Sequence, residues 1–168
     1  MPLNLLKQYN DLLELVSLNH SDKMASLKRI FTRDIAENKH FTFRNKALNP
    51  TPNDGVITME TLFTHLTTVI TDKATRKREF DIHRSVRLHW VKFHINENKP
   101  DTILVFSVKE PEGNRTYIYD KIENYVIVLE PLRVKNEYYL LTAYHVMGKD
   151  AQRNKFEKKY KRKLDELL

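Results

Sequence analysis

The sequence contains no cysteine and only three glycines among its 168 residues. The chain therefore has no disulfide scaffold, no cysteine nucleophile and no thiolate zinc site. A chain without cysteine is typical of the reducing cytoplasm, where we expect this protein to be located. The sequence also lacks a P-loop and the GxSxG pattern of serine hydrolases, so we expect neither a P-loop nucleotide-binding enzyme nor such a hydrolase.

Long apolar runs and metal-binding patterns are missing as well. No run approaches the ~20 apolar residues that a membrane-spanning helix needs, so we expect no membrane insertion. The first residues carry Lys7 and Asp11 and lack a small-residue cleavage site, which does not match a signal peptide. HExxH, an EF-hand pattern and a tight acidic cluster are absent, and we therefore expect no metal and no other cofactor.

What the sequence has in excess is positive charge. The formal net charge is +7 at pH 7, with 29 Lys and Arg against 22 Asp and Glu. Residues 1–75 hold 9 basic and 8 acidic side chains, whereas residues 76–168 hold 20 and 14. A basic half of a chain favours polyanionic partners such as nucleic acid.

Hydrophobic spacing predicts a helical first region, residues 1–75. Apolar residues recur every three or four positions between Leu5 and Val16, and again between Met24 and Ile35 behind a Ser21–Asp22 cap. An Asn- and Pro-rich loop, Asn49–Gly55, follows. Residues 59–70 fit either a short helix or a strand, because their spacing and their β-branched residues favour different structures.

The second region, residues 76–168, is predicted to be an α+β unit. A helix is expected over residues 80–97, followed by strands at residues 102–110, 115–121, 125–134 and 138–146 with short turns between them. Short connections between β-branched and aromatic runs indicate an antiparallel meander. A basic helix closes the chain. The expected fold is therefore α+β, with N-terminal helices, a small antiparallel sheet of about four strands and a C-terminal helix; both regions could form one compact unit.

The helix predicted over residues 80–97 carries an unusual polar row. At 100° per residue, His83, Arg87 and His94 share one face with Trp90, while His89 points to the opposite, solvent side. A buried arginine needs acceptors, and one explanation is an ion pair with a carboxylate such as Asp120 or Glu130. The other is a cleft in which histidines transfer protons and arginine neutralises a phosphate. We favour the cleft.

The strands offer further polar side chains. Alternation places Arg115, Tyr117 and Tyr119 on one face of their strand, and Thr142 and Tyr144 on one face of the last strand. Tyrosines on strands are often structural, but beside a basic half-chain they fit RNA recognition, in which aromatic rings stack on bases. For the segment LFTHLTT, with its histidine and threonines, an ordinary helix or strand surface is at least as good an explanation as a functional site.

RSVRLHW, RTYIYDK, YVIVLE and YYLLTAYHV occur in this order between residues 84 and 146. With the basic tail, this part of the chain resembles the phage-associated branch of the barnase/EndoU/colicin/RelE-like nuclease superfamily over residues 76–168. The resemblance implies a small antiparallel sheet, fronted by helices, that cleaves RNA without metal. It further implies attack of the 2′-hydroxyl on the adjacent phosphate to give a 2′,3′-cyclic product, often by toxins.

The resemblance also implies roles for individual residues. Arg87 and Arg115 would clamp the scissile phosphate, and His83 or His94 would act as general acid or base. Thr142 and Tyr117 would position phosphate or sugar. His145 is another candidate acid, although it needs a β-bulge near Ala143 to reach the face of Thr142. The RNA-binding residues that we expect in addition are Arg84, Lys92, Tyr119, Tyr144, Lys158, Lys159, Lys161 and Arg162.

The leading hypothesis is therefore a metal-independent endoribonuclease, a toxin-type effector that cleaves tRNA or mRNA. An acidic antitoxin or immunity protein is the partner that the resemblance implies. Two alternatives stay open at this point. One is a non-catalytic nucleic-acid-binding or regulatory module, and the other is a phage structural or interaction domain whose charge serves only its surface.

Overall fold

The computed structural model describes residues 2–53 and 55–168 and confirms the α+β class. Its centre is a curled, mixed sheet of six strands, larger than the predicted sheet of about four. The predicted antiparallel meander is confirmed as β7 (Ile103–Glu110), β8 (Gly113–Asp120), β9 (Tyr125–Leu132) and β10 (Glu137–His145). Two strands of the first region extend the sheet, β2 (Lys46–Pro50) and β1 (Thr42–Phe43).

Strand β2 explains why the predicted sheet was too small. It runs parallel to β10, with Leu48 opposite Tyr138 and Pro50 opposite Leu140. Strands so far apart in the chain share no turn, so the sequence carries no hairpin signal for this pairing. Pro50 has no N–H to donate, but it lies beyond the part of β2 that pairs with β1, so β2 has an open edge at this position.

Two short antiparallel pairs lie outside the main sheet. One joins β3 (Pro52–Asn53) to β4 (Val56–Ile57), inside and next to the predicted loop. The other joins β5 (Thr68–Asp72) to β6 (Lys77–Phe80). The prediction of a mainly helical region 1–75 was therefore wrong in part.

The helices of the first region differ from the prediction at its start. Residues 5–16 do not form the expected helix: a 3-10 turn, η1 (Pro2–Leu6), is followed by irregular chain. The second predicted helix is confirmed as α1 (His20–Phe31), capped by Asn19 and continued by the π-helical η2 (Thr32–Ala36). The ambiguous segment contains both structures, because α2 (Met59–Thr67) runs directly into β5.

The continuous helix predicted over residues 80–97 was wrong. Phe80 ends β6, and two short helices follow, α3 (Ile82–Ser85) and α4 (Trp90–Ile95). Between them the amides of Leu88 and Trp90 bond to carbonyls three residues back, so the chain makes tight turns. A helical wheel assumes a constant 100° per residue, and these turns break that phase. The common face of His83, Arg87 and His94 therefore does not form.

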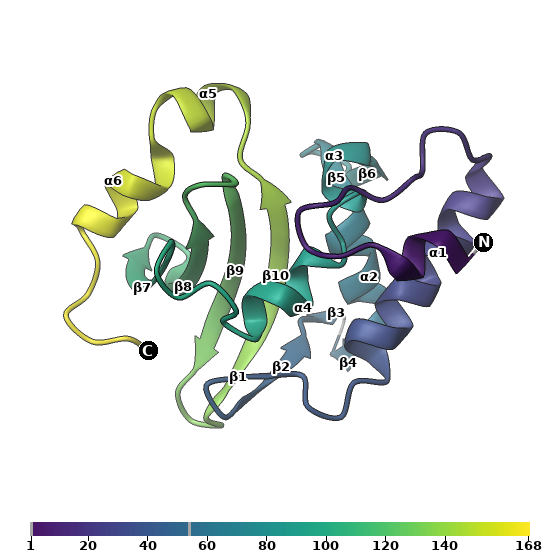
Figure 1. Ribbon diagram of the computed structural model, residues 1–168. Coiled ribbons are helices and arrows are strands. Elements are labelled where there is room, and N and C mark those ends of the chain that lie inside the picture. The colour runs from purple at the N-terminus through teal and green to yellow at the C-terminus, as the bar shows by residue number, and fades with distance from the viewer. Residues whose placement is uncertain (1, 54) are drawn as a thin grey trace.

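The sheet separates two apolar clusters (Figure 1). The N-terminal helices and α4 pack on one face, where the core includes Leu27, Ile118 and Leu140 and draws on both predicted regions. The C-terminal segment packs on the other face, where the buried Phe156 ring contacts Tyr117 and Tyr119. Each face of the central strands is thus at least partly covered.

The C-terminal helix is shorter than predicted and broken. It consists of α5 (Gly148–Gln152) and α6 (Lys155–Lys161), separated at Asn154, whose φ of 52° lies in the left-handed region. Asparagine adopts this conformation more readily than most residues, so it ends one helix and redirects the chain into the next. In the described parts of the chain, no helix has both the length and the apolar character needed to cross a membrane.

Candidate active site

His94 lies in the core rather than in a cleft. Its side chain is fully buried, with Nε2 2.9 Å from Oδ2 of Asp120 and Nδ1 2.7 Å from the carbonyl oxygen of Trp90. The Tyr9 hydroxyl (2.7 Å) and the Lys99 ammonium (3.3 Å) donate to the same carboxylate oxygen. This network fastens the N-terminal segment and α4 to the end of β8.

Asp120 stays ionised in this network. Burial by itself would raise the pKa of its carboxyl group, but hydrogen bonds from His94, Tyr9 and the Glu123 amide outweigh that effect. The pKa of Asp120 is therefore held well below its usual range. The network has the composition of a structural ion cluster, with every oxygen of the carboxylate occupied.

The remaining residues of the predicted row lie at the surface or near it. His83 is exposed, and Arg87 donates to its carbonyl oxygen (2.7 Å) while covering the Trp90 ring at 5.3 Å. The alternative explanation, an ion pair of Arg87 with Asp120 or Glu130, is wrong, because Asp120 binds His94 and Lys99 and Glu130 binds Arg115 (3.2 Å).

His89, expected at the solvent side, is instead buried with Nε2 3.1 Å from the carbonyl oxygen of Gln8. Because the turn before α4 changes the direction of this side chain, the N-terminal segment packs over it. Lys92 is half-buried on α4.

A different set of residues meets at the end of β10. The guanidinium of Arg84, from α3, donates to the Thr142 hydroxyl of β10 at 2.8 Å and to the His65 carbonyl of α2 at 2.9 Å. The Thr142 hydroxyl also donates to that carbonyl at 3.2 Å. Three elements that are far apart in the sequence are thus joined at one point.

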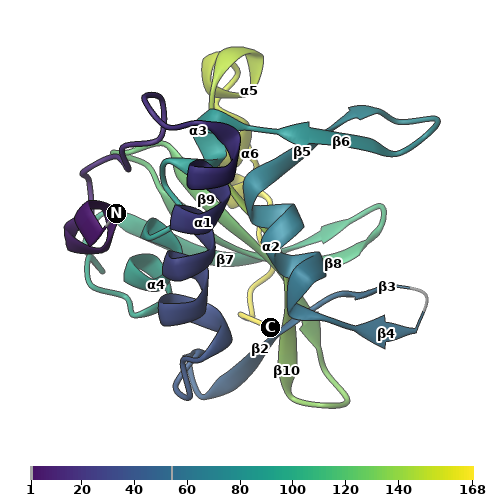
Figure 2. The same cartoon turned by 90° about the vertical axis from the view of Figure 1, so that its right-hand side faces the viewer.

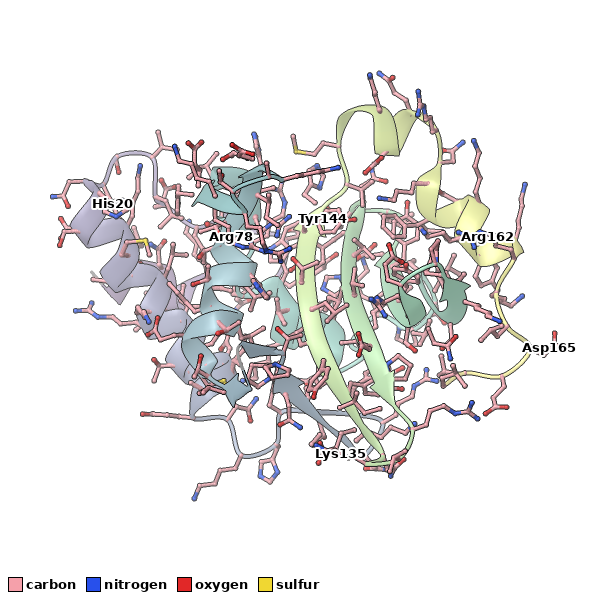
Figure 3. All side chains as sticks on the ribbon, turned by 180° about the vertical axis from the view of Figure 1, so that it is seen from behind. His20, Arg78, Lys135, Tyr144, Arg162 and Asp165 are labelled. Atoms are coloured by element: carbon pink, nitrogen blue, oxygen red, sulfur yellow. The ribbon has the colours of Figure 1, made fainter. Side chains whose placement is uncertain are left out.

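These residues line a cavity of about 320 Å³ together with Arg78 of β6, Thr51 and Leu141. We call this cavity the Arg84 pocket. The Tyr144 ring packs 5.2 Å from the Arg84 guanidinium. In Figure 3, Arg78 and Tyr144 lie at the end of β10 that is opposite to Lys135.

The backbone explains why Arg84 and Thr142 meet. Asp81 caps α3 by accepting from the Arg84 amide (3.0 Å), and its own amide donates to the carbonyl oxygen of Thr67 (2.9 Å) at the end of α2. The buried Ser85 hydroxyl donates to the same oxygen at 3.1 Å. These bonds fix the start of α3 against the end of α2, which places Arg84 over β10.

A β-bulge turns Thr142 toward the pocket. Leu140 pairs with Leu129 and faces the main core, but Thr142 pairs with Val128, so Leu141 is an extra residue. A bulge places the side chains beyond it on the opposite face of the sheet. A prediction from strict alternation along the strand does not account for this change. Because the bulge precedes both residues, His145 still points away from the face of Thr142.

The pocket holds positive charge without an acidic partner in the parts of the chain that the structure describes. Neither Arg78 nor Arg84 forms an ion pair there. Arg78 donates only to Thr68, and the Arg84 Nε atom is buried without a hydrogen-bond partner. Burial lowers the pKa of both guanidinium groups, and the neighbouring Arg84 and Arg76 charges lower that of Arg78 further. Such a cluster is stabilised by a bound anion.

His65 is kept neutral in this setting. Burial lowers the pKa of its imidazole, and the positive charges of Arg78, Arg84 and Arg76 lower it further. These effects outweigh a hydrogen bond to the Leu141 backbone, which raises the pKa, so the ring is mainly uncharged at neutral pH and carries a nitrogen lone pair. A neutral imidazole next to fixed guanidinium groups is suited to accept a proton at an anionic centre.

A second cavity, of about 280 Å³, adjoins the Arg84 pocket at Thr142 and collects several predicted residues. Its lining includes Arg115, Tyr117, Tyr144, Lys155 and Lys159. The charges here are largely paired. Arg115 binds Glu130, Lys155 lies 3.3 Å from Asp150, and Lys159 and Arg162 both bind Glu110.

The predicted stacking residues differ in accessibility. Tyr117 and Tyr119 are buried and donate to Glu110 (3.0 Å) and Glu157 (3.1 Å), so their rings are not free to stack on a base. Tyr144 is half-buried and borders the cavity. Of the predicted basic residues near the C-terminus, Lys158, Lys161 and Arg162 are exposed and Lys159 is half-buried.

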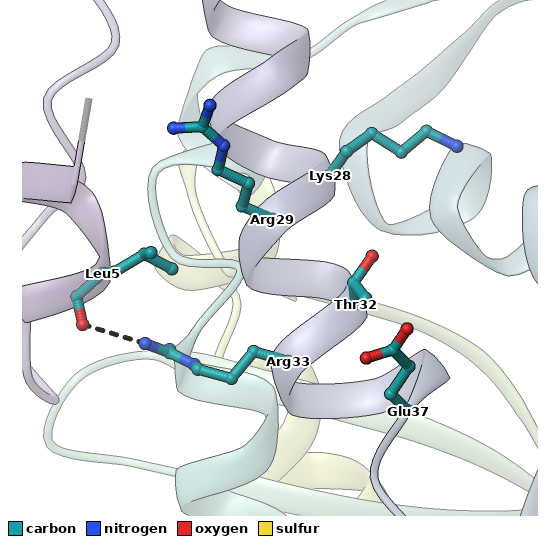
Figure 4. A pocket seen from close by; sticks show the side chains of 6 residues that line it. All are labelled: Leu5, Lys28, Arg29, Thr32, Arg33 and Glu37. Atoms are coloured by element: carbon teal, nitrogen blue, oxygen red, sulfur yellow. Dashed lines mark hydrogen bonds between the residues drawn. The ribbon is translucent and has the colours of Figure 1, made fainter.

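A wider cavity of about 630 Å³ lies between η1 and α1 and is less suited to an anion (Figure 4). Two of its cations are already occupied: Lys28 pairs with Glu60, and Arg33 pairs with Asp34 and donates to the Leu5 carbonyl at 2.9 Å. Arg29 remains as a cation at its wall.

Of the candidate residues predicted from the sequence, Arg84, Thr142 and Tyr144 lie together at this pocket. The prediction did not include Arg78 and assigned no role to His65. The only signals for these two were the basic run before Phe80 and the LFTHLTT segment. Comparison of the chain with protein-family models, curated proteins and solved structures gave no match. Within residues 2–53 and 55–168, no group of three or more His, Asp or Glu side chains is arranged to hold a metal ion.

Proposed function

We propose that the chain is a metal-independent endoribonuclease with its active site in the Arg84 pocket. One observation carries the proposal. A half-buried guanidinium, held by Thr142 and by the His65 carbonyl and paired with no carboxylate in the described residues, lines a cavity beside a neutral imidazole. The net charge of +7 and the resemblance of residues 76–168 to metal-free ribonucleases support RNA as the anion.

Each step of the reaction has a group in or beside the pocket. Arg84 and Arg78 bind the non-bridging oxygens of the scissile phosphate, and their charge stabilises the negative charge that develops there. His65 removes the proton from the ribose 2′-hydroxyl. The 2′-oxygen then bonds to phosphorus, and the bond between phosphorus and the 5′-oxygen breaks.

The departing 5′-oxygen needs a proton, and Tyr144 is the donor that this arrangement offers. Burial raises the pKa of Tyr144, so the hydroxyl group keeps its proton at neutral pH, and nearby Lys155 stabilises the phenolate after transfer. The products are a 2′,3′-cyclic phosphate and a free 5′-hydroxyl. The phosphate-clamping role that the resemblance gave to Arg87 and Arg115 passes in this proposal to Arg84 and Arg78.

We extend the proposal to the biological setting that the resemblance implies. A toxin-type effector would cleave tRNA or mRNA in the cytoplasm, and an acidic antitoxin or immunity protein would cover the positive pocket. The alternative with the same site is a nucleic-acid-binding module that holds RNA without cleaving it.

Cleavage in excess EDTA separates these two functions. We expect the purified protein to convert RNA into fragments ending in 2′,3′-cyclic phosphate, and His65→Gln to lower the rate at least a hundredfold because the general base is lost. His20→Gln, on the exposed first turn of α1, is the matched control and should cleave like the unchanged protein. RNA that stays intact but bound would support the binding module and refute the nuclease.

The pH dependence of cleavage should reflect the protonation of His65. Its lowered pKa predicts that kcat/KM rises with pH below about 6.5, the ordinary histidine value, and is level above it until another group titrates. Arg78→Gln removes a nearby positive charge that opposes protonation, so the pKa of His65 should rise and the acid limb should move to higher pH. An acid limb that stays in place or moves to lower pH in this variant would exclude His65 as the base.

A further inference from the structure

The β5–β6 hairpin projects from the body of the protein (Figure 2). It forms a two-stranded sheet of its own, and every residue from 71 to 77 is exposed. An isolated two-stranded hairpin is marginally stable in water, and its surface is open to a partner on both faces.

The tip of this hairpin is basic. Its turn contains Lys73 and Arg76, while the Asp72 carboxylate accepts hydrogen bonds from the amides of Ala74 (2.9 Å) and Thr75 (3.3 Å). The side chain of Asp72 thus shapes the turn. Lys77 and Glu79 pair with each other at 3.4 Å. In the described residues, Lys73 and Arg76 have no ion-pair partner.

A cavity connects the tip with the proposed active site. Arg76 lines a space of about 550 Å³ together with the side chains of Thr61 and Thr64, and His65 borders both this space and the Arg84 pocket. Glu60, a further lining residue, is paired with Lys28. Positive charge therefore continues from Arg84 through Arg78 and Arg76 to the tip, with threonine hydroxyls along the way.

We infer that the hairpin and this cavity bind the phosphate backbone of the RNA strand next to the scissile phosphate. The inference rests on the proposed function, because it takes the Arg84 pocket as the place of cleavage. Guanidinium, ammonium and hydroxyl groups are the usual donors to phosphate, and such contacts position a strand without reading its sequence. Contacts of the β5–β6 hairpin therefore raise the affinity for long RNA and leave the chemical step unchanged.

The test compares two hairpin tips. Lys73→Gln/Arg76→Gln removes both charges from the β5–β6 tip, and Arg133→Gln/Lys135→Gln removes two exposed charges from the β9–β10 turn at the far end of β10 (Figure 3). Binding of a labelled 2′-O-methyl RNA strand, which lacks the attacking hydroxyl, is measured by fluorescence anisotropy over a series of salt concentrations. Cleavage of a dinucleotide is measured in parallel.

We expect the β5–β6 variant to bind about tenfold more weakly, with a salt slope shallower by about 1.4 for two lost phosphate contacts on a single strand. Its kcat/KM for the dinucleotide should be unchanged at about pH 8, where His65 is neutral with or without the Arg76 charge. The β9–β10 variant should bind as the unchanged protein does. An equal loss of RNA affinity in both variants, or no loss in the β5–β6 variant, would overturn the inference. If RNA binding depends on the β5–β6 tip but the protein cleaves no RNA, the nuclease proposal is refuted and the RNA-binding role of the hairpin is retained.

Discussion

Replacing Arg84 by glutamine is expected to lower kcat/KM for RNA cleavage by about a thousandfold, the upper range for loss of one donor to developing charge. In the proposed mechanism the guanidinium neutralises the phosphate, and Thr142 and the His65 carbonyl hold it in place. Glutamine retains an amide donor for these partners but carries no charge. Initial rates on a defined RNA, with product ends identified by mass spectrometry, measure the effect.

Two further variants sharpen this prediction. Arg84→Lys keeps the charge but loses the planar pair of donors, so most of the activity should still be absent. Arg153→Gln removes an exposed arginine after α5 and serves as the matched control with unchanged activity. Thermal unfolding of each variant shows whether the fold is intact. If the folded Arg84→Gln protein cleaves RNA within tenfold of the original rate, Arg84 has no role in the active site.

Asp120→Asn should lower the free energy of unfolding by about 3–5 kcal/mol, since it removes the charge from a cluster in which the Asp120 and His94 side chains are fully buried. His94 and Lys99 would lose their carboxylate partner, and the Tyr9 hydroxyl would lose a charged acceptor. Urea unfolding followed by tryptophan fluorescence measures the change, because Trp90 is buried beside this cluster. Asp101→Asn, at an exposed position, is the control and should shift the midpoint little.

The pH dependence of stability gives an independent check. The folded pKa of Asp120 lies below its unfolded value of about 3.9. Its contribution to stability is therefore fully present above that value and is lost as the pH falls toward the folded pKa. The difference in unfolding free energy between the original protein and Asp120→Asn should shrink below about pH 4. A difference that stays constant with pH would mean that the carboxylate charge does not stabilise the fold.

Local patterns in the sequence determined the meander from Ile103 to His145, the α1 helix and the α+β class. These features depend on side-chain alternation, helical spacing and short turns, which lie within a few residues of each other. The basic character of the chain was accessible in the same way, and Arg84, Thr142 and Tyr144 were among the candidate residues that the sequence indicated.

Tertiary contacts decided the rest. Strand β2 pairs with β10 across almost ninety residues, the tight turns before Trp90 break the expected helix, and the bulge at Leu141 reverses the face of Thr142. The β2–β10 pairing joins segments that share no turn, and neither the turns nor the bulge has a signature in side-chain spacing. His94, predicted as a catalytic residue, was thereby buried against Asp120, whereas His65 joined Arg84 in the pocket. The sequence supplied the charges, and the long-range packing of α2, α3 and β10 decided which of them meet.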